Sequence, residues 1–261
     1  MTFEQVLTDS IAALDPVLKS AKKGAAATAS SLKMVGEGDI RMVDKRLADA
    51  EEALHAASQG ISAFRGQWIG VELREYFGSE EYIVELTRYL DDARVSYHRL
   101  DNVLYVYPAL VRFDPDLTGA RVDKKMESRI GPRTLAALLQ GIQSRPSKFP
   151  AGRFLRSLFR VYKALASANL KRSEQWTGKS LFLRDIYEVL SAAPGSDYSE
   201  QEFGRDIYLL DASGVPLEAS GHLATLQASS GTRDERKTLS IITRDGQRKV
   251  YCAIRFDPIV R

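Results

Sequence analysis

The sequence predicts a mainly helical α+β protein, and three patterns indicate this class. Apolar residues recur at helical spacing through most of the first ninety positions. Between residues 95 and 122 the period shortens to two, which is typical of strands. After Ser199 a helix-start signal is followed by three strand-like runs. We therefore expect three domains: a helical hairpin or coiled coil (1–78), an α+β basic region with a small β-meander (79–173), and a helix-and-strand module (174–261).

The N-terminal region is expected to hold two helices. The first is amphipathic from Phe3 to about Lys23, and a soft connection rich in Ala, Ser and Gly follows over residues 24–38. Asp39 can cap the second helix. That helix has two apolar heptad series: Ile40, Leu47, Leu54, Ile61 and Trp68, and then Val43, Ala50, Ala57, Phe64 and Val71. Such a helix packs along a partner, either the first helix or, through residues 40–71, another subunit or a second copy.

The central region alternates in structure type. A helix is expected over Glu80–Asp92, and Asp101-Asn102 is a candidate two-residue turn within the meander. The expected strands lie, in order, at 95–100, 103–107, 110–113 and 120–122. Helices are then expected over Pro132–Gln143 and Gly152–Arg172, which places the meander just before two helices.

Positive charge is concentrated in the middle of the chain. Leu117 to Ser173 contains 13 basic and two acidic residues, whereas residues 1–116 contain 13 and 19, and residues 174–261 contain 11 and 13. The net charge of +3 conceals this segregation. A local positive field indicates an anionic partner, and nucleic acid, above all duplex DNA, is the leading candidate.

The expected helix over 152–172 has a one-sided basic surface. Arg153, Arg156, Arg160 and Lys163 follow steps of three and four residues and so share one face, opposite leucine and aromatic residues. No acid occurs between Glu127 and Glu174 to neutralise them within the helix. The alternatives are a solvated face, or pairing with the acidic N-terminal hairpin or an acidic partner. A membrane surface is disfavoured, because the apolar side lacks a Trp-rich border.

A second basic cluster lies where the meander meets the next helix. Its members are Arg121, Lys124, Lys125, Arg129 and Arg133. With Tyr105, Tyr107 and Phe113 nearby in sequence, it could form a stacking platform for single strands. Core packing is the alternative interpretation of these alternating aromatic residues.

The C-terminal module begins with a short helix over 181–190. Ser199 and Glu202 have capping-box spacing and open a further helix that ends near Asp211. Strands are expected at 223–228, 238–243 and 249–256. This order of helices followed by a three-strand set resembles a winged helix over about residues 179–256.

The winged-helix resemblance implies where the module would meet DNA. Residues 199–211 would be the recognition helix, with Gln201, Arg205 and Tyr208 opposite its buried side. The wing would be the loop over 229–237, with Arg233, Arg236 and Lys237 available for phosphates. The acidic residues of the helix favour protein docking as the alternative.

Catalytic and metal-binding motifs are absent from the sequence. The three histidines lie far apart, Cys252 sits in an apparent strand, and no glycine-rich phosphate loop occurs, so we expect no cofactor and no metal. Asp114, Asp116 and Asp123 are the nearest approach to a metal-dependent nuclease site. The start of the sequence lacks signal-peptide character, and no apolar run reaches about 18 residues, so we expect a cytoplasmic protein.

These features together predict a non-enzymatic, nucleic-acid-binding accessory subunit. The layout is similar to that of accessory subunits of bacterial DNA-handling or anti-phage defence complexes. The alternatives are an interaction scaffold that does not contact nucleic acid and, as an outside case, a metal-dependent nuclease.

Overall fold

The computed structural model describes residues 1–168, 175–192, 197–228 and 237–259. The chain divides into two compact units. The first comprises Met1–Tyr89, Pro115–Thr118 and Arg129–Leu135, and the second comprises Leu90–Asp114, Gly119–Ser128 and Ala136–Arg261. Long helices dominate and two five-stranded antiparallel sheets accompany them, so the predicted mainly helical α+β class is confirmed.

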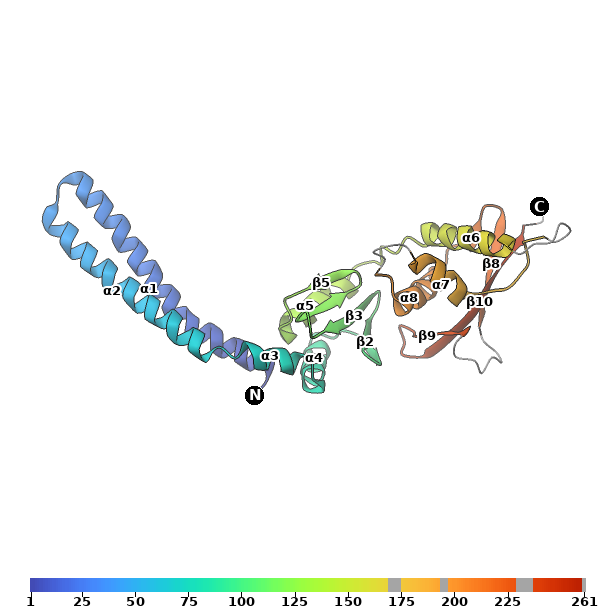
Figure 1. The fold of residues 1–261 in the computed structure, drawn as a ribbon, viewed down its shortest axis with the longest axis horizontal. Helices are drawn as coiled ribbons and strands as arrows, with labels where there is room; N and C mark the ends of the chain where they lie inside the picture. The colour runs from blue at the N-terminus through green and yellow to red at the C-terminus, as the bar shows by residue number, and fades with distance from the viewer. Residues whose placement is uncertain (169–174, 193–196, 229–236, 260–261) are drawn as a thin grey trace. The chain divides into compact units, whose positions relative to one another are not determined.

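Two long antiparallel helices form the helical hairpin of the first unit (Figure 1): α1 (Phe3–Glu37) and α2 (Ile40–Gln67). The expected soft connection over 24–38 is therefore wrong, because α1 continues through it. Small residues favour this outcome, since Ala is a strong helix former and Gly24 admits the other helix closely. A Cβ on Gly24 would lie 2.6 Å from Leu54 Cγ. The chain reverses at Gly38, which takes a φ of +76° that suits glycine.

The two heptad series of α2 have different environments. Asp39 caps the helix as predicted, its Oδ1 accepting from the N–H of Met42 at 3.2 Å. In the second series Ala50 and Ala57 face inward, both 4% exposed, but Val71 is 67% exposed, because α2 ends at Gln67 and Val71 belongs to the next helix. The first series lies at the edge of the pair, and its five members are 46–77% exposed: Ile40, Leu47, Leu54, Ile61 and Trp68. The antiparallel hairpin therefore uses only one of the two apolar positions.

A buried carboxylate closes the base of the helical hairpin, beside α3 (Gly70–Phe77) and α4 (Glu80–Asp92). Glu85 accepts hydrogen bonds from the N–H groups of Phe3 and Glu4 at 2.8 and 2.9 Å, and from the hydroxyl of Tyr76 at 3.0 Å. It thus satisfies free N–H groups in the first turn of α1 and places a negative charge at that positive helix end.

The second unit contains the β-meander, whose strands pair in sequence order. They are β1 (His98–Leu100), β2 (Val103–Val106), β3 (Ala109–Asp114), β4 (Gly119–Val122) and β5 (Lys125–Glu127). The predicted two-residue turn is confirmed, since Leu100 pairs with Val103 and Asp101 takes a φ of +52°. Helix α5 (Pro132–Gln143) follows, within the bounds expected for it.

A second sheet and three helices complete this unit. In chain order they are α6 (Ala151–Ala168), β6 (Leu181–Phe182), α7 (Leu183–Ser191), α8 (Glu200–Asp211), β7 (Glu218–Ala219), β8 (His222–Ala228), β9 (Leu239–Ile242) and β10 (Arg248–Pro258). The strand order is β6-β10-β8-β7, and β9 pairs with the first residues of β10. The predicted capping box is present, with Ser199 and Glu202 each accepting the other's N–H.

Helix α8 is covered on two sides. Phe203, Ile207 and Leu210 join the main core with α6, α7 and the second sheet. On its other side, Tyr208 and Leu209 pack against apolar residues of the meander. This double burial fixes the position of α8 within the unit and leaves α6 at the surface. Within the described residues, no helix is both long and apolar enough to cross a bilayer.

Candidate nucleic-acid interface

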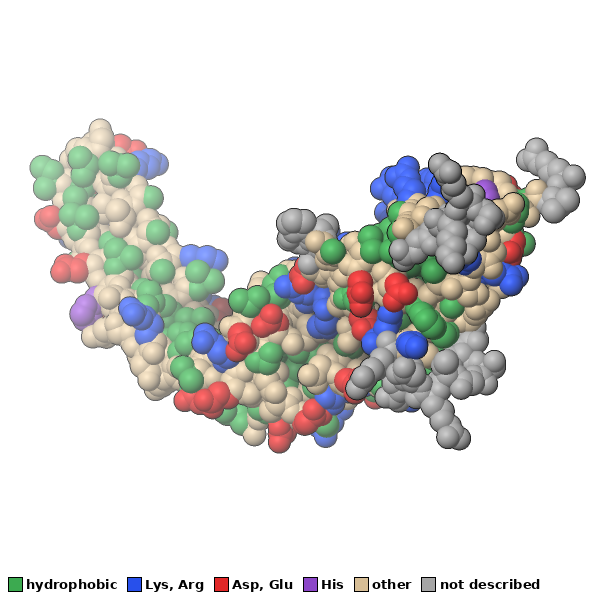
Figure 2. All heavy atoms as spheres, turned by 45° about the vertical axis from the view of Figure 1, so that its right-hand side comes forward, with side chains coloured by type: hydrophobic (Ala, Val, Ile, Leu, Met, Phe, Trp, Pro, Cys, Tyr) green, Lys and Arg blue, Asp and Glu red, His purple; other side chains and the backbone are tan. Residues whose placement is uncertain are grey.

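Helix α6 has the one-sided basic surface that its sequence predicts. Its four predicted cations are all exposed: Arg153, Arg156, Arg160 and Lys163. Its apolar residues are buried in the core: Leu155, Leu158, Phe159, Tyr162 and Ala166. Among the described residues, none of the four cations forms an ion pair with an acid. Figure 2 shows Lys and Arg side chains gathered on the part of the surface that includes α6.

A groove of about 500 Å³ runs along this basic face. It is lined by Arg156, Phe159, Arg160, Lys163, Ala164, Ser167 and Ser220. Ser220 comes from the turn between β7 and β8, where Ser220 and Gly221 both take positive φ, as a tight two-residue hairpin requires. Cationic groups with neighbouring hydroxyls make up a donor set suited to phosphate oxygens.

Aromatic rings support the same groove from below. Phe159 stacks against His222 at 5.3 Å and against Trp176 at 5.8 Å between ring centres. The Lys163 ammonium lies 5.4 Å from the centre of the Trp176 ring. Trp176, Ser220 and His222 could not be predicted to lie beside the basic helix, because only tertiary folding brings them there. A lone tryptophan in a polar loop was the only local signal.

The second predicted basic cluster is divided between the two units. Arg129 and Arg133 belong to the first unit, whereas Arg121, Lys124 and Lys125 belong to the second. In the first unit, Arg133 lies 3.7 Å from a carboxylate oxygen of Glu4 and stacks over Tyr89 at 5.7 Å, and Arg129 is exposed.

Two of the three cations of this cluster in the second unit interact with nearby side chains. Arg121 forms an ion pair with Asp197, and Lys124 lies 5.1 Å from the centre of the Tyr198 ring. Lys125 is exposed in β5. Fewer cations are therefore available to bind an anion here than on the outward face of α6.

The predicted outward face of α8 is wrong for two of its three residues. Gln201 is exposed, but Arg205 is 9% exposed and Tyr208 packs against Tyr107 with 5.0 Å between ring centres. The cause is tertiary, because the meander covers the side of α8 that the isolated pattern left open. Neither residue can reach a DNA groove from this position.

Arg205 is instead the centre of a buried polar network. Its guanidinium pairs with Asp123, bonds Asp206 at 2.7 Å and reaches the carbonyl of Pro108 at 3.5 Å. Tyr198 donates to the other Asp206 oxygen at 2.7 Å. Burial raises the pKa of Asp206 against the opposing effect of Arg205. Burial would lower the pKa of Arg205, but the charges of Asp206 and Asp123 outweigh it and raise that pKa.

The remaining predicted residues have varied positions. Of the wing, Arg233 and Arg236 lie outside the described residues, while Lys237 is exposed and its ammonium lies 5.3 Å from the Phe182 ring centre.

The predicted stacking platform is wrong, because Tyr105 and Tyr107 are only 1% and 4% exposed.

The acidic residues considered for a metal site do not gather. Asp114 ends β3, Asp116 lies in the following turn, and Asp123 is held by Arg205 and the N–H of Leu110. In the described ranges, no group of three or more His, Cys, Asp or Glu side chains is placed to hold a metal ion.

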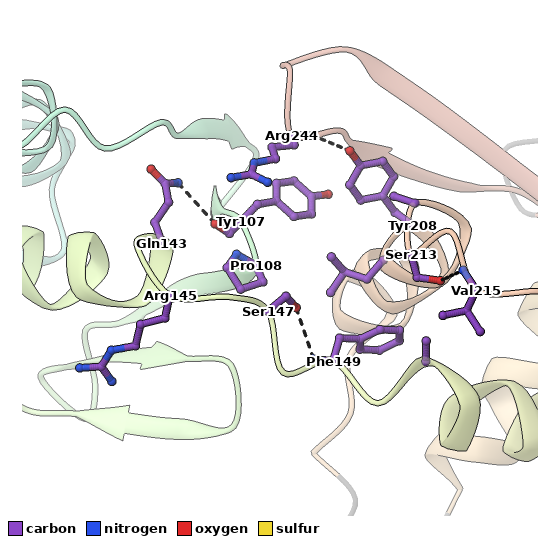
Figure 3. Close-up of a pocket in the computed structure, with 13 residues that line it drawn as sticks. Tyr107, Pro108, Gln143, Arg145, Ser147, Phe149, Tyr208, Ser213, Val215 and Arg244 are labelled. Atoms are coloured by element: carbon purple, nitrogen blue, oxygen red, sulfur yellow. Dashed lines mark hydrogen bonds between the residues drawn. The ribbon is translucent and has the colours of Figure 1, made fainter.

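A further cavity of about 380 Å³ lies within the second unit (Figure 3). Several of its polar groups already have hydrogen-bond partners: the Gln143 amide bonds the backbone of Ser96 at 2.8 Å, and the Arg244 N–H donates to the Tyr208 hydroxyl at 3.2 Å. Arg145 extends away from the cavity in Figure 3. This cavity therefore offers fewer free groups for an anion than the groove on α6.

Comparisons of this chain with family models, with curated proteins and with solved structures find no match.

Proposed function

We propose that the protein binds nucleic acid, with duplex DNA as the expected ligand, through the outward face of α6. The observation that carries the proposal is the set of four exposed cations with no acid among the described residues to neutralise them. Like charges at this spacing repel by a few tenths of a kcal/mol per pair, and phosphates would relieve that repulsion. The protein would act as a non-enzymatic accessory subunit of a larger bacterial DNA-handling or defence assembly.

The dimensions of α6 fit a phosphate backbone. At about 1.5 Å per residue, the stretch from Arg153 to Lys163 spans roughly 15 Å. Duplex DNA carries one charge per about 1.7 Å of its axis, so a stretch of duplex as long as this face carries roughly nine phosphate charges. The hydroxyls of Ser167 and Ser220 at the groove add hydrogen-bond donors beside the cations.

We also propose that residues 151–258 form a winged-helix-like module, starting at α6 rather than near Lys179. Support comes from the element order α6, β6, α7, α8, β8, β10 and from the pairing of β10 with both β6 and β8. In this module the usual recognition helix would be α8. Because the meander covers α8, we assign DNA contact to α6 and leave α8 a structural role.

Charge reversal on α6 tests the proposal. Binding of a fluorescent duplex is measured for the full chain from about 50 to 200 mM salt. Four phosphate contacts predict a slope of log K against log salt of about −3 to −4. Arg156→Glu with Arg160→Glu should abolish binding, because both side chains line the groove and neither is needed for the core.

The matched control is Lys22→Glu with Lys23→Glu, which makes the same charge change at exposed positions of α1. It should leave most of the binding intact. No binding at about 50 mM salt, a flat salt dependence, or equal loss in both variants would overturn the proposal. Capture of an acidic protein without DNA binding would support the scaffold alternative instead.

A further inference from the structure

The helical hairpin leaves a continuous apolar face uncovered. On α2 it consists of the exposed heptad series: Ile40, Leu47, Leu54, Ile61 and Trp68. On α1 it consists of five more exposed apolar residues: Ile11, Leu14, Leu18, Leu32 and Val35. We call these ten residues the hairpin face. Figure 2 shows hydrophobic side chains along the helical hairpin.

Both series lie on the same side of the helical hairpin. On α1, Leu18 follows the inward-facing Val17 by one position, and on α2, Leu54 follows the buried Ala53 by one position. Because the two helices are antiparallel, the side chain one position after an inward-facing residue points toward the same side of the helical hairpin on both helices. The opposite side has small residues, which line a shallow groove there: Ala13, Ala56, Gly60 and Ala63.

Seven of the ten residues of the hairpin face are arranged symmetrically about one level. On α2 the series is centred on Leu54, with Leu47 and Ile61 equally spaced to either side. On α1, Leu18 and Leu32 are equally spaced about Ala25. The two centres lie at the same height, because Gly24 contacts Leu54 across the helical hairpin. A two-fold axis at this level would superpose the α2 series on itself and exchange Leu18 with Leu32, whereas Ile11, Leu14 and Val35 would face positions 39, 36 and 15 of the other copy.

We propose that the hairpin face binds a second copy of this chain, forming an antiparallel four-helix bundle with a two-fold axis near Leu54. Such an interface is isologous, so each patch must be self-complementary, as the α2 series and the Leu18–Leu32 pair are. The pairs across the axis are Leu54 with Leu54, Leu47 with Ile61, Ile40 with Trp68, and Leu18 with Leu32. The small residues Ala21 and Ala25 at the centre of α1 leave room for the leucines of the partner.

The area is sufficient for a stable dimer. A large side chain presents on the order of 150 Å² when fully exposed, and these ten are 38–77% exposed. They therefore offer roughly 800 Å² per copy, which is what each partner buries in an interface of standard size. A monomer that exposed this much contiguous apolar surface would be unusual.

Charges at the edge of the hairpin face favour the antiparallel register. Asp44, Glu51 and Arg65 are exposed beside the heptad series. Two-fold pairing about Leu54 sets Asp44 of one copy near Arg65 of the other, twice. A parallel dimer would instead oppose identical charges at all three positions.

Light scattering coupled to size exclusion tests the proposal on the full chain. We expect twice the 29.0 kDa mass of one chain at micromolar concentration. Leu32→Glu with Ile61→Glu should weaken dimerisation at least tenfold, while Ala56→Glu with Ala63→Glu on the opposite side should not. Circular dichroism shows whether each variant keeps its helices. A monomer throughout the micromolar range, or equal effects of the two pairs, would overturn the proposal.

Cysteine cross-linking tests the register. Under oxidation Leu54→Cys should link to itself, since the axis places it opposite its own copy. Ile40→Cys alone should not link, but a mixture of Ile40→Cys and Trp68→Cys chains should. The unmodified chain, whose single Cys252 is buried, is the background control. Self-linking of Ile40→Cys without linking of Leu54→Cys would show another register and refute the antiparallel arrangement.

Discussion

Arg205 holds a positive charge inside the second unit, where the residue is only 9% exposed. The network around it satisfies its donors with two carboxylates and a carbonyl from separate parts of the chain. Buried charges of this kind contribute by being paired, and removing one partner leaves the others without compensation. Arg205 is thus a structural residue that links α8 to the meander.

We predict that Arg205→Ala destabilises the protein by about 3–5 kcal/mol, because Asp123 and Asp206 lose their buried cation. Urea unfolding followed by circular dichroism measures the change. Gln201→Ala on the same helix is the control and should alter stability by less than about 0.5 kcal/mol, since Gln201 is exposed. A small effect of Arg205→Ala on stability, together with a large loss of DNA binding, would restore the recognition-helix interpretation.

The exposed positions of the α6 cations could be predicted from the sequence, but the burial of Arg205 could not. The face of α6 follows from spacing within one helix, which is a local property. The burial of Arg205 depends on Asp123, which is 82 residues away. Adjacent Arg205-Asp206 between Phe203 and Ile207 was a weak local sign of a paired charge.

At the scale of elements, helix α1 depends on a carboxylate from α4. Glu85 is 5% exposed and accepts three hydrogen bonds at the base of the helical hairpin. The pKa of Tyr76 is raised to about 12 by burial, then by its hydrogen bond to Glu85 and the charge of that carboxylate. The first turn of α1 and the hydroxyl of Tyr76 therefore share one acceptor.

We expect Glu85→Ala to cost about 2–3 kcal/mol of unfolding free energy, because buried N–H groups lose their acceptor. The same change should lower the pKa of Tyr76, which phenolate absorbance during alkaline titration measures. Asp92→Ala, at an exposed position of α4 whose charge is not among those acting on Tyr76, serves as the control for both readouts. An unchanged Tyr76 titration in Glu85→Ala would contradict the shared-acceptor arrangement.

The starts of two helices could be predicted because capping residues mark them in the sequence. The capping box at Ser199 and the Asp39 cap act within one helical turn, so the sequence displays them. The continuation of α1 through residues 24–38 was not predictable in the same way. It depends on close packing of Gly24 against Leu54, and a glycine read alone indicates a break.

Across the whole molecule, buried tyrosines connect stability to alkaline pH. Burial raises the pKa of seven tyrosines: Tyr76, Tyr82, Tyr105, Tyr107, Tyr162, Tyr198 and Tyr251. The pKa rises to about 12 for Tyr76 and Tyr105. An unfolded tyrosine ionises near pH 10. The folded state therefore keeps protons that the unfolded state has lost.

This difference predicts that stability is fully present below about pH 10 and falls as the pH rises through 10 to 12. Urea unfolding at about pH 8, 10 and 11 should show a steepening loss. The phenols of these seven tyrosines should therefore stay protonated above about pH 10 until the chain unfolds. Constant stability up to about pH 11, or smooth ionisation of all phenols near pH 10, would contradict the prediction.

The pairing of β10 has a consequence for the order of folding during synthesis. This strand pairs with β6, β8 and β9, so the second sheet cannot assemble until the ribosome has made residues 248–258. The helices α1 and α2 meet across a short turn and can fold as soon as they emerge. Two growing chains could therefore join through their hairpin faces before the module that contains α6 is complete.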